Sequence, residues 1–339
     1  MFGRAVYLTN YESDQLKSGS FDYCFTSLHI PEELNVSFGE RAAEMLRDFR
    51  THGIKVIADV SPRTLEAMHV RDLAELKEQT GIEIFRLDYG FSEEDVARIE
   101  RSCRIAVNAS TVLSETEMRS SNATFAIHNY YPRPETGLDP DFFQKLNERW
   151  HAAGIQTAAF IAGDSEKRGP LCKGLPTLEM HRTLPPYVQY LDLKRTYKTD
   201  LVLLGDPEIS AYEERLITET EQDGVIRIPA RLKESHQDLY GKVFHNRPDA
   251  PKDFIRCMES RMYATPGETV SPADCAERKR GSITMDNERN LRYSGEIQIV
   301  RADYPANDAI NVIGKVLPAY MMAVDLVGRG DAWMFYPAE

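Results

Sequence analysis

The chain of 339 residues lacks several features that mark particular classes of protein. Its five cysteines lie far apart and form no C-x-x-C pair, so the sequence predicts neither a disulfide framework nor a zinc knuckle. No window approaches the ~18 consecutive apolar residues of a membrane span, and the N-terminus lacks the pattern of a signal peptide. We therefore expect a protein of the cytoplasm with reduced thiols and no membrane partner.

Positive charge is also scarce. The sequence holds 41 Lys and Arg against 53 Asp and Glu, which gives a formal net charge of −12. This balance disfavours non-specific binding to a phosphate backbone, although it is compatible with a local basic pocket for a small anion. We predict no nucleic-acid partner.

The sequence does contain one repeated unit, a short β-rich run that ends in a polar residue and is followed by amphipathic helical sequence. Eight such runs lie at residues 5–10, 23–29, 55–61, 83–89, 104–110, 123–129, 156–164 and 201–206. Eight parallel strands that alternate with helices form a (β/α)₈ TIM barrel, an α/β fold. The connection at 11–22 is near the lower limit for a parallel crossover, so we expect a turn or two of helix there at most.

Helical patterns fill the intervals between these runs. Residues 39–53 carry apolar side chains at helical spacing and end in Gly53, a residue suited to the position after a helix. Segments 64–81 and 139–154 repeat this design, and each also closes with glycine. The sequence predicts one helix in each segment.

The length exceeds what one hydrophobic core usually fills, so we predict a barrel domain at 1–222 and a small β-rich domain at 223–339. From residue 224 the sequence is strand-like with frequent turns, and helix-length amphipathic sequence occurs only around 250–262. We expect a β-rich lid or a module for oligomer contacts.

One run of this second domain, residues 292–299, has an alternating pattern and carries three side chains that could contact a substrate. These are Arg292, Tyr293 and Glu296. The pattern favours an ordinary strand with one polar face over a contact with substrate.

In a (β/α)₈ barrel the C-terminal strand ends and the loops after them converge on one mouth, where catalytic groups gather. The polar residues expected there are Thr9, Asn10, His29, Glu32, Asp59, Arg86, Asp88, Asn108, Ser110, His128, Asn129, Asp164 and Asp206. An aspartate that ends a strand can instead cap a helix or a turn, and this alternative applies to Asp59, Asp164 and Asp206. Asp88 shares a strand face with Arg86, so its alternatives are an internal ion pair and a functional carboxylate, of which we favour the second.

The segment HNYYPRPETG (128–137) concentrates recognition chemistry after one apolar run. A single imidazole such as His128 is most often a core residue, but it is followed here by an amide and two phenols. Aromatic faces and planar hydrogen-bond donors are typical of a carbohydrate-binding loop. Arg133 lies between two prolines, and a guanidinium held in this way suits bidentate binding of phosphate or carboxylate.

A long loop at 167–182 follows the seventh run and contains Glu179 and Arg182. Long structured loops at a barrel mouth are commonly lids or binding loops. The centre of the loop, GLPTL, has the composition of a buried segment, which disfavours the alternative of a solvated charged segment.

Several strings resemble those of the bacterial 6-phospho-N-acetylmuramidase family, in order and over nearly the whole chain. They are HNYYPRPETGL (128–138), GLPTLEMHR (174–182), FRLDYG (85–90), VNAST (107–111) and DNERNLRYSGEIQI (286–299). The resemblance implies a barrel followed by a small β-rich domain of cyclophilin-like shape. It also implies cytoplasmic hydrolysis of N-acetylmuramic acid 6-phosphate linked β-1,4 to N-acetylglucosamine, in cell-wall recycling. The short first crossover departs from the family pattern, in which a full helix is usual.

A substrate of this kind carries a phosphate, a lactyl carboxylate and an acetamido group, so its site needs cations, amides and aromatic rings. The predicted substrate-binding residues are Arg86, Asn108, His128, Asn129, Tyr130, Arg133, Thr136 and Arg182. We expect no cofactor and no metal.

Glycoside hydrolysis needs a proton for the leaving oxygen and a second group that supplies the nucleophile, usually two carboxyls. Asp59 and Asp88 end adjacent runs and are the predicted catalytic pair, with Glu179 or Asp206 as replacements for either. Assistance by the acetamido group of the substrate remains open as an alternative.

Rival functions use the same mouth. A metal-dependent sugar-phosphate isomerase or epimerase could use Asp59, Asp88, His128 and Asp206, but the sequence contains no H-x-H pair among them. A Schiff-base aldolase is disfavoured because no run ends in lysine. A non-catalytic phosphosugar-binding protein would keep the anion ligands without a carboxylate pair.

Overall fold

The computed structural model describes residues 1–11, 21–28, 38–87, 90–110, 123–260 and 269–339. The chain divides into two compact units, Met1–Glu213 and Glu214–Glu339. Three predicted mouth residues, His29, Glu32 and Asp88, lie outside the described residues, as does most of the first crossover.

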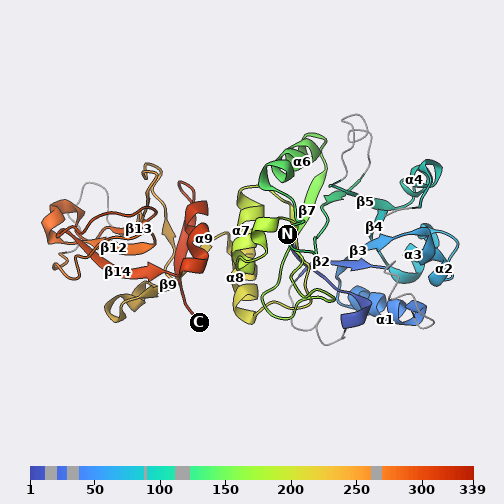
Figure 1. Ribbon diagram of the computed structural model, residues 1–339, viewed down its shortest axis with the longest axis horizontal. Helices are drawn as coiled ribbons and strands as arrows, with labels where there is room; N and C mark the ends of the chain where they lie inside the picture. Colours follow the sequence, from blue (N-terminus) through green and yellow to red (C-terminus); the bar gives the residue numbers. More distant parts are fainter. Residues whose placement is uncertain (12–20, 29–37, 88–89, 111–122, 261–268) are drawn as a thin grey trace. The chain divides into compact units, whose positions relative to one another are not determined.

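The first unit is a closed barrel of eight parallel strands that follow one another in chain order (Figure 1). The strands are β1 (Phe2–Ala5), β2 (Tyr23–Ser27), β3 (Lys55–Val60), β4 (Ile84–Leu87), β5 (Arg104–Asn108), β6 (Phe125–Ile127), β7 (Gln156–Ile161) and β8 (Leu201–Leu204). Closure pairs Gly3 of β1 with Leu203 of β8. A Cβ at Gly3 would lie 2.5 Å from the carbonyl oxygen of Tyr23, so this close approach requires glycine. The predicted TIM barrel is confirmed.

The first strand lies earlier than the sequence predicts. Residues 5–10 were expected to form it, but β1 ends at Ala5 and Leu8–Asn10 forms a short 3₁₀ helix, η1. The prediction followed the apolar run, whereas the pairing of Gly3 with Tyr23 of β2 sets the strand.

Helices follow most of the strands and lie around the barrel (Figure 1). They are α1 (Phe38–Thr51), α2 (Pro62–Ala67), α3 (Leu73–Thr80), α4 (Glu93–Ile99), α6 (Pro140–Ala152) and α7 (Pro186–Arg195). Helix α8 (Ala211–Asp223) follows β8 and contains the boundary between the two units. The single helix predicted over 64–81 is wrong, because this segment contains two. Asp72 starts the second helix by accepting a hydrogen bond from Glu75 N, and His69 has a positive φ of 54° between the two.

The alternation of strand side chains separates two cores. Inside the barrel lie residues such as Phe25, Ile57, Ile84, Phe125 and Phe160. Side chains at the intervening positions pack against the helices. Because alternation continues to the strand ends, the residue that follows an inward position by two is directed at the mouth.

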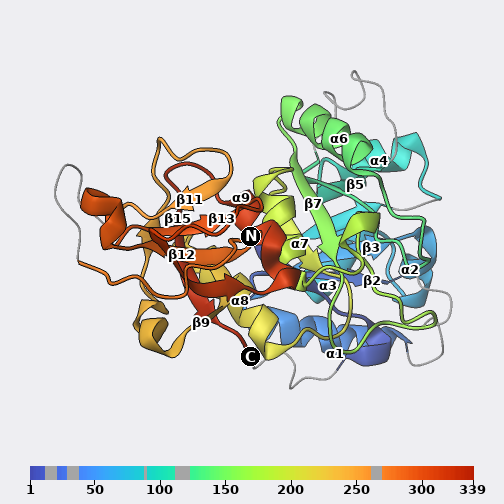
Figure 2. The ribbon, with the colours of Figure 1, turned by 60° about the vertical axis from the view of Figure 1, so that its left-hand side comes forward.

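The second unit is built on a seven-stranded mixed sheet with the order β10-β15-β9-β14-β12-β13-β11 (Figure 2). The strands are β9 (Ile226–Leu232), β10 (Phe244–His245), β11 (Phe254–Arg256), β12 (Ser282–Asp286), β13 (Ile297–Val300), β14 (Ile310–Val316) and β15 (Ala332–Pro337). The predicted β-rich C-terminal part is therefore present.

Two local predictions in this unit are wrong. The helical pattern around 250–262 contains strand β11, whose three residues pair with β13. The run 292–299 is a strand only from Ile297, because Glu288–Tyr293 forms the 3₁₀ helix η5. Helix α9 (Met321–Leu326) also lies in this unit. In β11, pairing with a distant strand overrides the local periodicity.

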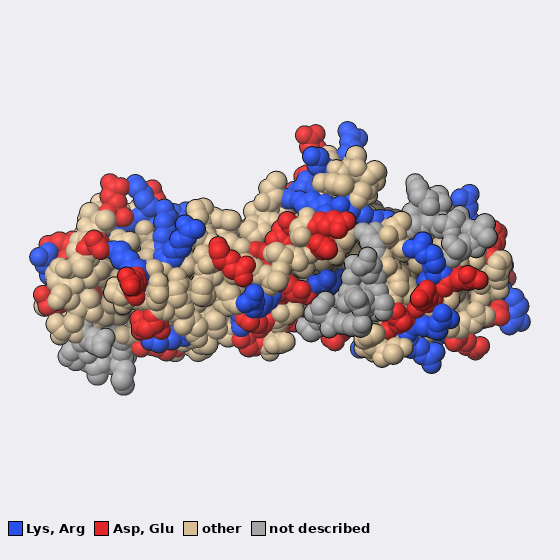
Figure 3. Space-filling model, turned by 90° about the horizontal axis from the view of Figure 1, so that it is seen from below, with Lys and Arg blue, Asp and Glu red and all other residues tan. Residues whose placement is uncertain are grey.

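The surface mixes both signs of charge, as expected for an acidic protein without one dominant basic face. On the side drawn in Figure 3, acidic side chains are interspersed with small groups of Lys and Arg. Within the part of the chain that the structure describes, no helix is long and apolar enough to cross a bilayer.

Candidate active site

Three predicted site residues meet at the barrel mouth. Asp59 and Arg86 are register partners on β3 and β4, and Arg86 Nη1 donates to Asp59 Oδ1 over 3.0 Å. Arg86 Nη2 donates to Asn129 Oδ1, just beyond β6. Both side chains of the ion pair are buried, with exposures of 8% for Arg86 and 10% for Asp59. The strand alternation thus delivers a buried carboxylate, guanidinium and amide to one place.

This ion pair differs from the alternative that the sequence suggested for Arg86. The expected partner was Asp88 on the same strand, whereas the structure pairs Arg86 with Asp59 on the neighbouring strand. Asp88, the second predicted catalytic carboxyl, is outside the described residues.

The segment after β5 supports the same cluster. Asn108 Oδ1 accepts a hydrogen bond from Ser110 N over 3.0 Å, so its side chain forms a turn across the strand end. Ser110 Oγ in turn accepts from Asn129 N over 3.3 Å. Both residues therefore help to hold the Asn129 backbone beside Arg86.

His128 faces away from the barrel interior and packs against α6. Its Nε2 donates to Asn147 Oδ1 over 2.9 Å, and its ring lies 4.4 Å from that of Phe143, centroid to centroid. Burial lowers the pKa of His128 to about 4, so the imidazole is neutral near pH 7. The arrangement is that of the core histidine considered as the alternative from the sequence: the ring is fully buried, and its Nδ1 lies 3.5 Å from Ser110 Oγ.

Glu179 and Arg182 join the two mouth loops. Glu179 accepts hydrogen bonds from Glu135 N and Gly137 N at 2.9 and 2.8 Å, and from Arg182 Nε at 2.7 Å. These donors, with Arg182 first, lower the pKa of Glu179 to about 2. A carboxyl with that pKa is ionised at neutral pH and does not act as a proton donor.

The donors of Arg182 are used within the protein. Besides Glu179, its guanidinium donates to the carbonyl oxygens of Lys173 and Gly174 on its own loop, and of Tyr131 and Arg133 on the other. An anion-binding role, as predicted from the sequence, would require breaking these contacts. The geometry supports a positioning role instead.

Arg133 and Thr136 lie on the exposed rim of the loop that Arg182 holds. Thr136 Oγ1 donates to the carbonyl oxygen of Arg133 over 2.6 Å, which tightens the turn between the prolines. The Arg133 side chain is exposed and extends from this fixed backbone.

Sequence reasoning missed Arg168, which lies over an aromatic pair in the mouth. Its guanidinium carbon lies 3.5 Å from the ring centroid of Tyr7, and Nη1 donates to Tyr130 Oη over 3.0 Å. The available signal was the Lys-Arg pair soon after the seventh run. From this loop the sequence analysis selects only Glu179 and Arg182.

Asp206 and Asp164 bind local backbone, as in the alternative for strand-end aspartates. Asp206 is fully buried and accepts hydrogen bonds from the backbone N–H groups of Gly163, Arg168 and Leu175 at 2.9, 3.0 and 3.1 Å. Burial raises its pKa above the usual value. Asp164 accepts from Ser210 N and Oγ just before α8. Asp206 thereby fixes the loop that carries Arg168.

The fold is that of a two-unit (β/α)₈-barrel protein with a polar, charged mouth. Among the described residues, no group of three or more His, Cys, Asp or Glu side chains could hold a metal ion. Residues 3–219 match the N-terminal family model of 6-phospho-N-acetylmuramidase, and residues 226–336 match the C-terminal one. The chain belongs to the 6-phospho-N-acetylmuramidase family of glycoside hydrolases.

Two solved structures are similar over nearly the whole length. A conserved protein from a locus in Enterococcus faecalis with an unknown function is 29% identical, with a TM-score of 0.85 over 99% of this chain and 96% of that chain. An uncharacterized B. cereus protein is 24% identical, with a TM-score of 0.78 over 100% of this chain and 99% of that chain, and shows the fold alone. No curated protein sequence matches the chain.

Proposed function

We propose that this protein hydrolyses the β-1,4 bond between N-acetylmuramic acid 6-phosphate and N-acetylglucosamine. The observation that carries the proposal is the buried Asp59–Arg86–Asn129 cluster at the mouth of a barrel of this family. A buried carboxylate can take part in the acid–base chemistry of glycoside hydrolysis. The guanidinium and the amide beside it can form hydrogen bonds with the acetamido group of such a substrate.

Asp59 is the catalytic carboxyl that the described residues offer. Its partner Arg86 favours the ionised form through charge and hydrogen bonding, which suits a nucleophile, a general base or a group that orients the acetamido amide. We assign the proton donor to Asp88, the other member of the carboxyl pair that the sequence predicts. Glu179 is disfavoured for that step because its low pKa keeps it ionised.

Recognition of the 6-phosphate is assigned to Arg133. Its backbone is held by Thr136 and Arg182, so the exposed guanidinium starts from a fixed position on the rim. A charge-assisted bidentate contact from a pre-organised arginine is a strong way to bind phosphate. Arg182 contributes indirectly by joining the two loops.

A turnover assay with two disaccharides tests the proposal. The purified protein is incubated with the 6-phosphorylated and the unphosphorylated disaccharide, and released N-acetylglucosamine is measured by mass spectrometry. We expect release from the phosphorylated compound. Binding without release would instead indicate a non-catalytic phosphosugar-binding protein.

Chelation separates hydrolysis from the metal-dependent isomerase alternative. We expect turnover to survive exhaustive treatment with EDTA, because the described acidic side chains at the mouth are engaged with Arg86, Arg182 or backbone N–H groups and form no cluster of metal ligands. Loss of activity that a divalent metal restores would contradict the proposed mechanism.

A further inference from the structure

The proposed substrate brings two anionic groups to the barrel mouth, and each needs a cationic partner. They are the phosphate at carbon 6 of the muramic acid ring and the lactyl carboxylate at carbon 3. Of the three arginines among the predicted substrate-binding residues, Arg86 pairs with Asp59, and Arg182 holds two loops together. Arg133 on the rim is assigned to the phosphate. The carboxylate therefore needs another ligand.

Arg168, on the loop after β7, lies at the mouth over side chains of the barrel interior. Its guanidinium carbon is 3.5 Å from the ring centroid of Tyr7, a member of the interior core. Its Nη1 donates to Tyr130 Oη over 3.0 Å, and the Tyr130 ring packs on Phe160 at 5.2 Å between centroids. Arg168 and Tyr130 are only half-buried. This cation thus covers the packed interior and remains accessible to a ligand.

The loop holds Arg168 in a defined position. The backbone N–H of Arg168 donates to the buried Asp206 carboxylate over 3.0 Å, and the same carboxylate accepts from Leu175 N over 3.1 Å. Further along the loop, Thr177 Oγ1 donates to the carbonyl oxygen of Asn129 over 2.9 Å. A side chain that starts from a fixed backbone and rests on an aromatic ring loses little conformational freedom when it binds a ligand.

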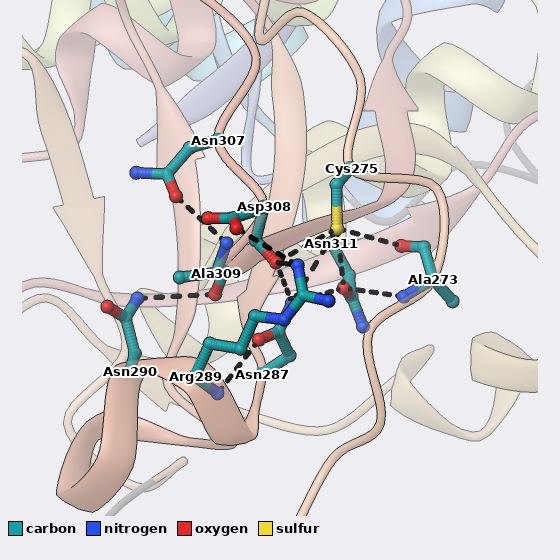
Figure 4. A network of polar contacts seen from close by, with 9 residues as sticks. All are labelled: Ala273, Cys275, Asn287, Arg289, Asn290, Asn307, Asp308, Ala309 and Asn311. Atoms are coloured by element: carbon teal, nitrogen blue, oxygen red, sulfur yellow. Dashed lines mark hydrogen bonds and ion pairs between the residues drawn. The ribbon is translucent and has the colours of Figure 1, made fainter.

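Contacts with an aromatic ring hold a guanidinium without neutralising its charge. At 3.5 Å the guanidinium lies on the face of the Tyr7 ring, so its N–H groups point outwards along its edges. An exposed arginine of the second unit shows a different arrangement. Arg289 Nη1 donates to Asp308 Oδ2 over 3.0 Å within the polar network drawn in Figure 4, so a carboxylate offsets its charge. The stacked arrangement of Arg168 is the one that suits an anionic ligand.

The place of Arg168 matches the lactyl group better than the phosphate. On the sugar ring, the lactyl group at carbon 3 is the direct neighbour of the acetamido group at carbon 2, whereas the phosphate is attached across the ring. The side chains suited to the acetamido group are Arg86 and Asn129, which are hydrogen-bonded to each other. Tyr130, the partner of Arg168, follows Asn129 directly in the chain. Neighbouring substituents of the sugar thus correspond to neighbouring side chains of the mouth.

We propose that Arg168 binds the lactyl carboxylate of the substrate and so distinguishes a muramic acid from a glucosamine derivative. The guanidinium donates along one edge to the carboxylate, while Tyr7 and Tyr130 hold it in place. The inference rests on the proposed function, because it names a ligand of the same substrate. It makes Arg168 a specificity-determining residue without a part in proton transfer.

Two sugar phosphates that differ only in the lactyl group test this assignment. Isothermal titration calorimetry of the full chain measures the dissociation constants of N-acetylmuramic acid 6-phosphate and N-acetylglucosamine 6-phosphate. We expect the wild type to bind the muramic acid derivative at least about tenfold more tightly. Arg168→Gln should weaken that binding at least about tenfold, because a charge-assisted contact is lost, and should leave binding of the glucosamine derivative within about twofold.

Two further variants separate recognition from a structural role. Arg168→Lys keeps the charge without the bidentate geometry, so it should recover part of the preference. Arg289→Gln removes an exposed guanidinium from the second unit and should bind both sugars as the wild type does.

Three results would overturn the proposal. Equal weakening of both sugars in Arg168→Gln would indicate a phosphate ligand or a structural effect. An unchanged preference in this variant would show that Arg168 does not contact the lactyl group. A wild type that binds neither sugar, or binds both equally, would also contradict the assignment.

The titrations need no turnover, so this inference and the proposed function can fail separately. The same preparations are assayed for disaccharide hydrolysis. Absence of hydrolysis, together with a preference that Arg168→Gln abolishes, would count against the proposed function alone. Hydrolysis of the phosphorylated disaccharide with an unchanged preference in the variant would count against the role of Arg168 alone.

Discussion

Two arginine–carboxylate pairs at the barrel mouth have different surroundings. Arg86 and Asp59 are both buried, and Arg86 shares its second amino group with an amide side chain. Arg182 is similarly buried, but Glu179 is 31% exposed and the other donors of Arg182 go to backbone carbonyls of two loops. One pair joins side chains at the strand ends, and the other joins loops.

The comparison shows that an ion pair at a barrel mouth is not by itself a catalytic feature. Glu179 accepts four hydrogen bonds that lower its pKa to about 2. Its carboxylate therefore holds the loops together and is not available as a proton donor. Among the described residues, Arg86 Nε has no hydrogen-bond partner although it is buried. An unused donor next to a buried carboxylate marks the first pair as the one with capacity for a ligand.

Breaking the strand-end pair Asp59–Arg86 should have the largest effect on turnover. Asp59→Asn keeps the shape and an acceptor for Arg86 but removes the negative charge, so turnover should fall at least about a hundredfold while substrate binding persists. Steady-state kinetics with a matched Asp164→Asn control, at an exposed carboxylate after β7, measures this. Near-normal turnover would show that Asp59 is not catalytic.

The loop that the second pair holds carries Arg133, which we expect to bind the 6-phosphate of the substrate. Arg133→Ala should lower kcat/KM for the phosphorylated disaccharide about a hundredfold, because one charge-assisted ligand contributes about 2–3 kcal/mol. Arg149→Ala, on the last turn of α6, is the control. The ratio of kcat/KM for the phosphorylated to the unphosphorylated disaccharide is measured for each protein. If this ratio is the same in the variant and the wild type, Arg133 does not bind the phosphate.

Removing the loop–loop pair should act mainly on stability. Arg182→Ala should lower the free energy of unfolding by about 2 kcal/mol, because Glu179 and four carbonyl oxygens lose a common donor. Arg98→Ala, at an exposed pair with Asp95, should lower it much less, because solvent screens an exposed pair. Urea unfolding measures both, and equal small losses would contradict a joining role for Arg182.

The smallest expected effect is a pH dependence of stability, which arises from Glu179 in the loop–loop pair. The pKa of Glu179 falls from 4.5 to about 2 on folding, so its contribution to stability is present above about pH 4.5 and is lost as the pH falls towards 2. The Glu179→Gln variant should lack this part of the acid sensitivity. Unfolding curves between pH 2 and 5 that have the same slope for both proteins would contradict the assignment.

The sequence predicted the barrel well because its evidence is local and repeated. Every one of the eight predicted runs overlaps a strand, and the N-cap of α6 at Asp139 marks where that helix begins. The prediction failed where pairing with a distant strand determines the local secondary structure. Residues 250–262 have a helical pattern, yet Phe254–Arg256 pairs with β13.

The candidate site was predicted only in part. The sequence selected Asp59, Arg86 and Asn129, since each lies at or just after the end of an apolar run. It also selected Arg182 as an anion ligand, because sequence does not show that backbone carbonyls consume the guanidinium donors. Arg168 was missed for the same reason, since its contact with Tyr7 joins the loop after β7 to the segment after β1.

By itself, then, the sequence determined the order of strands, the residue types at their ends and the family strings, because each depends on spacing along the chain. Only the tertiary structure decided that Arg86 pairs with Asp59 and that His128 faces α6. It also decided that the guanidinium of Arg168 lies over the ring of Tyr7. Partner choice depends on which strands become neighbours and in which register, and closure of the barrel and pairing within the sheet fix both.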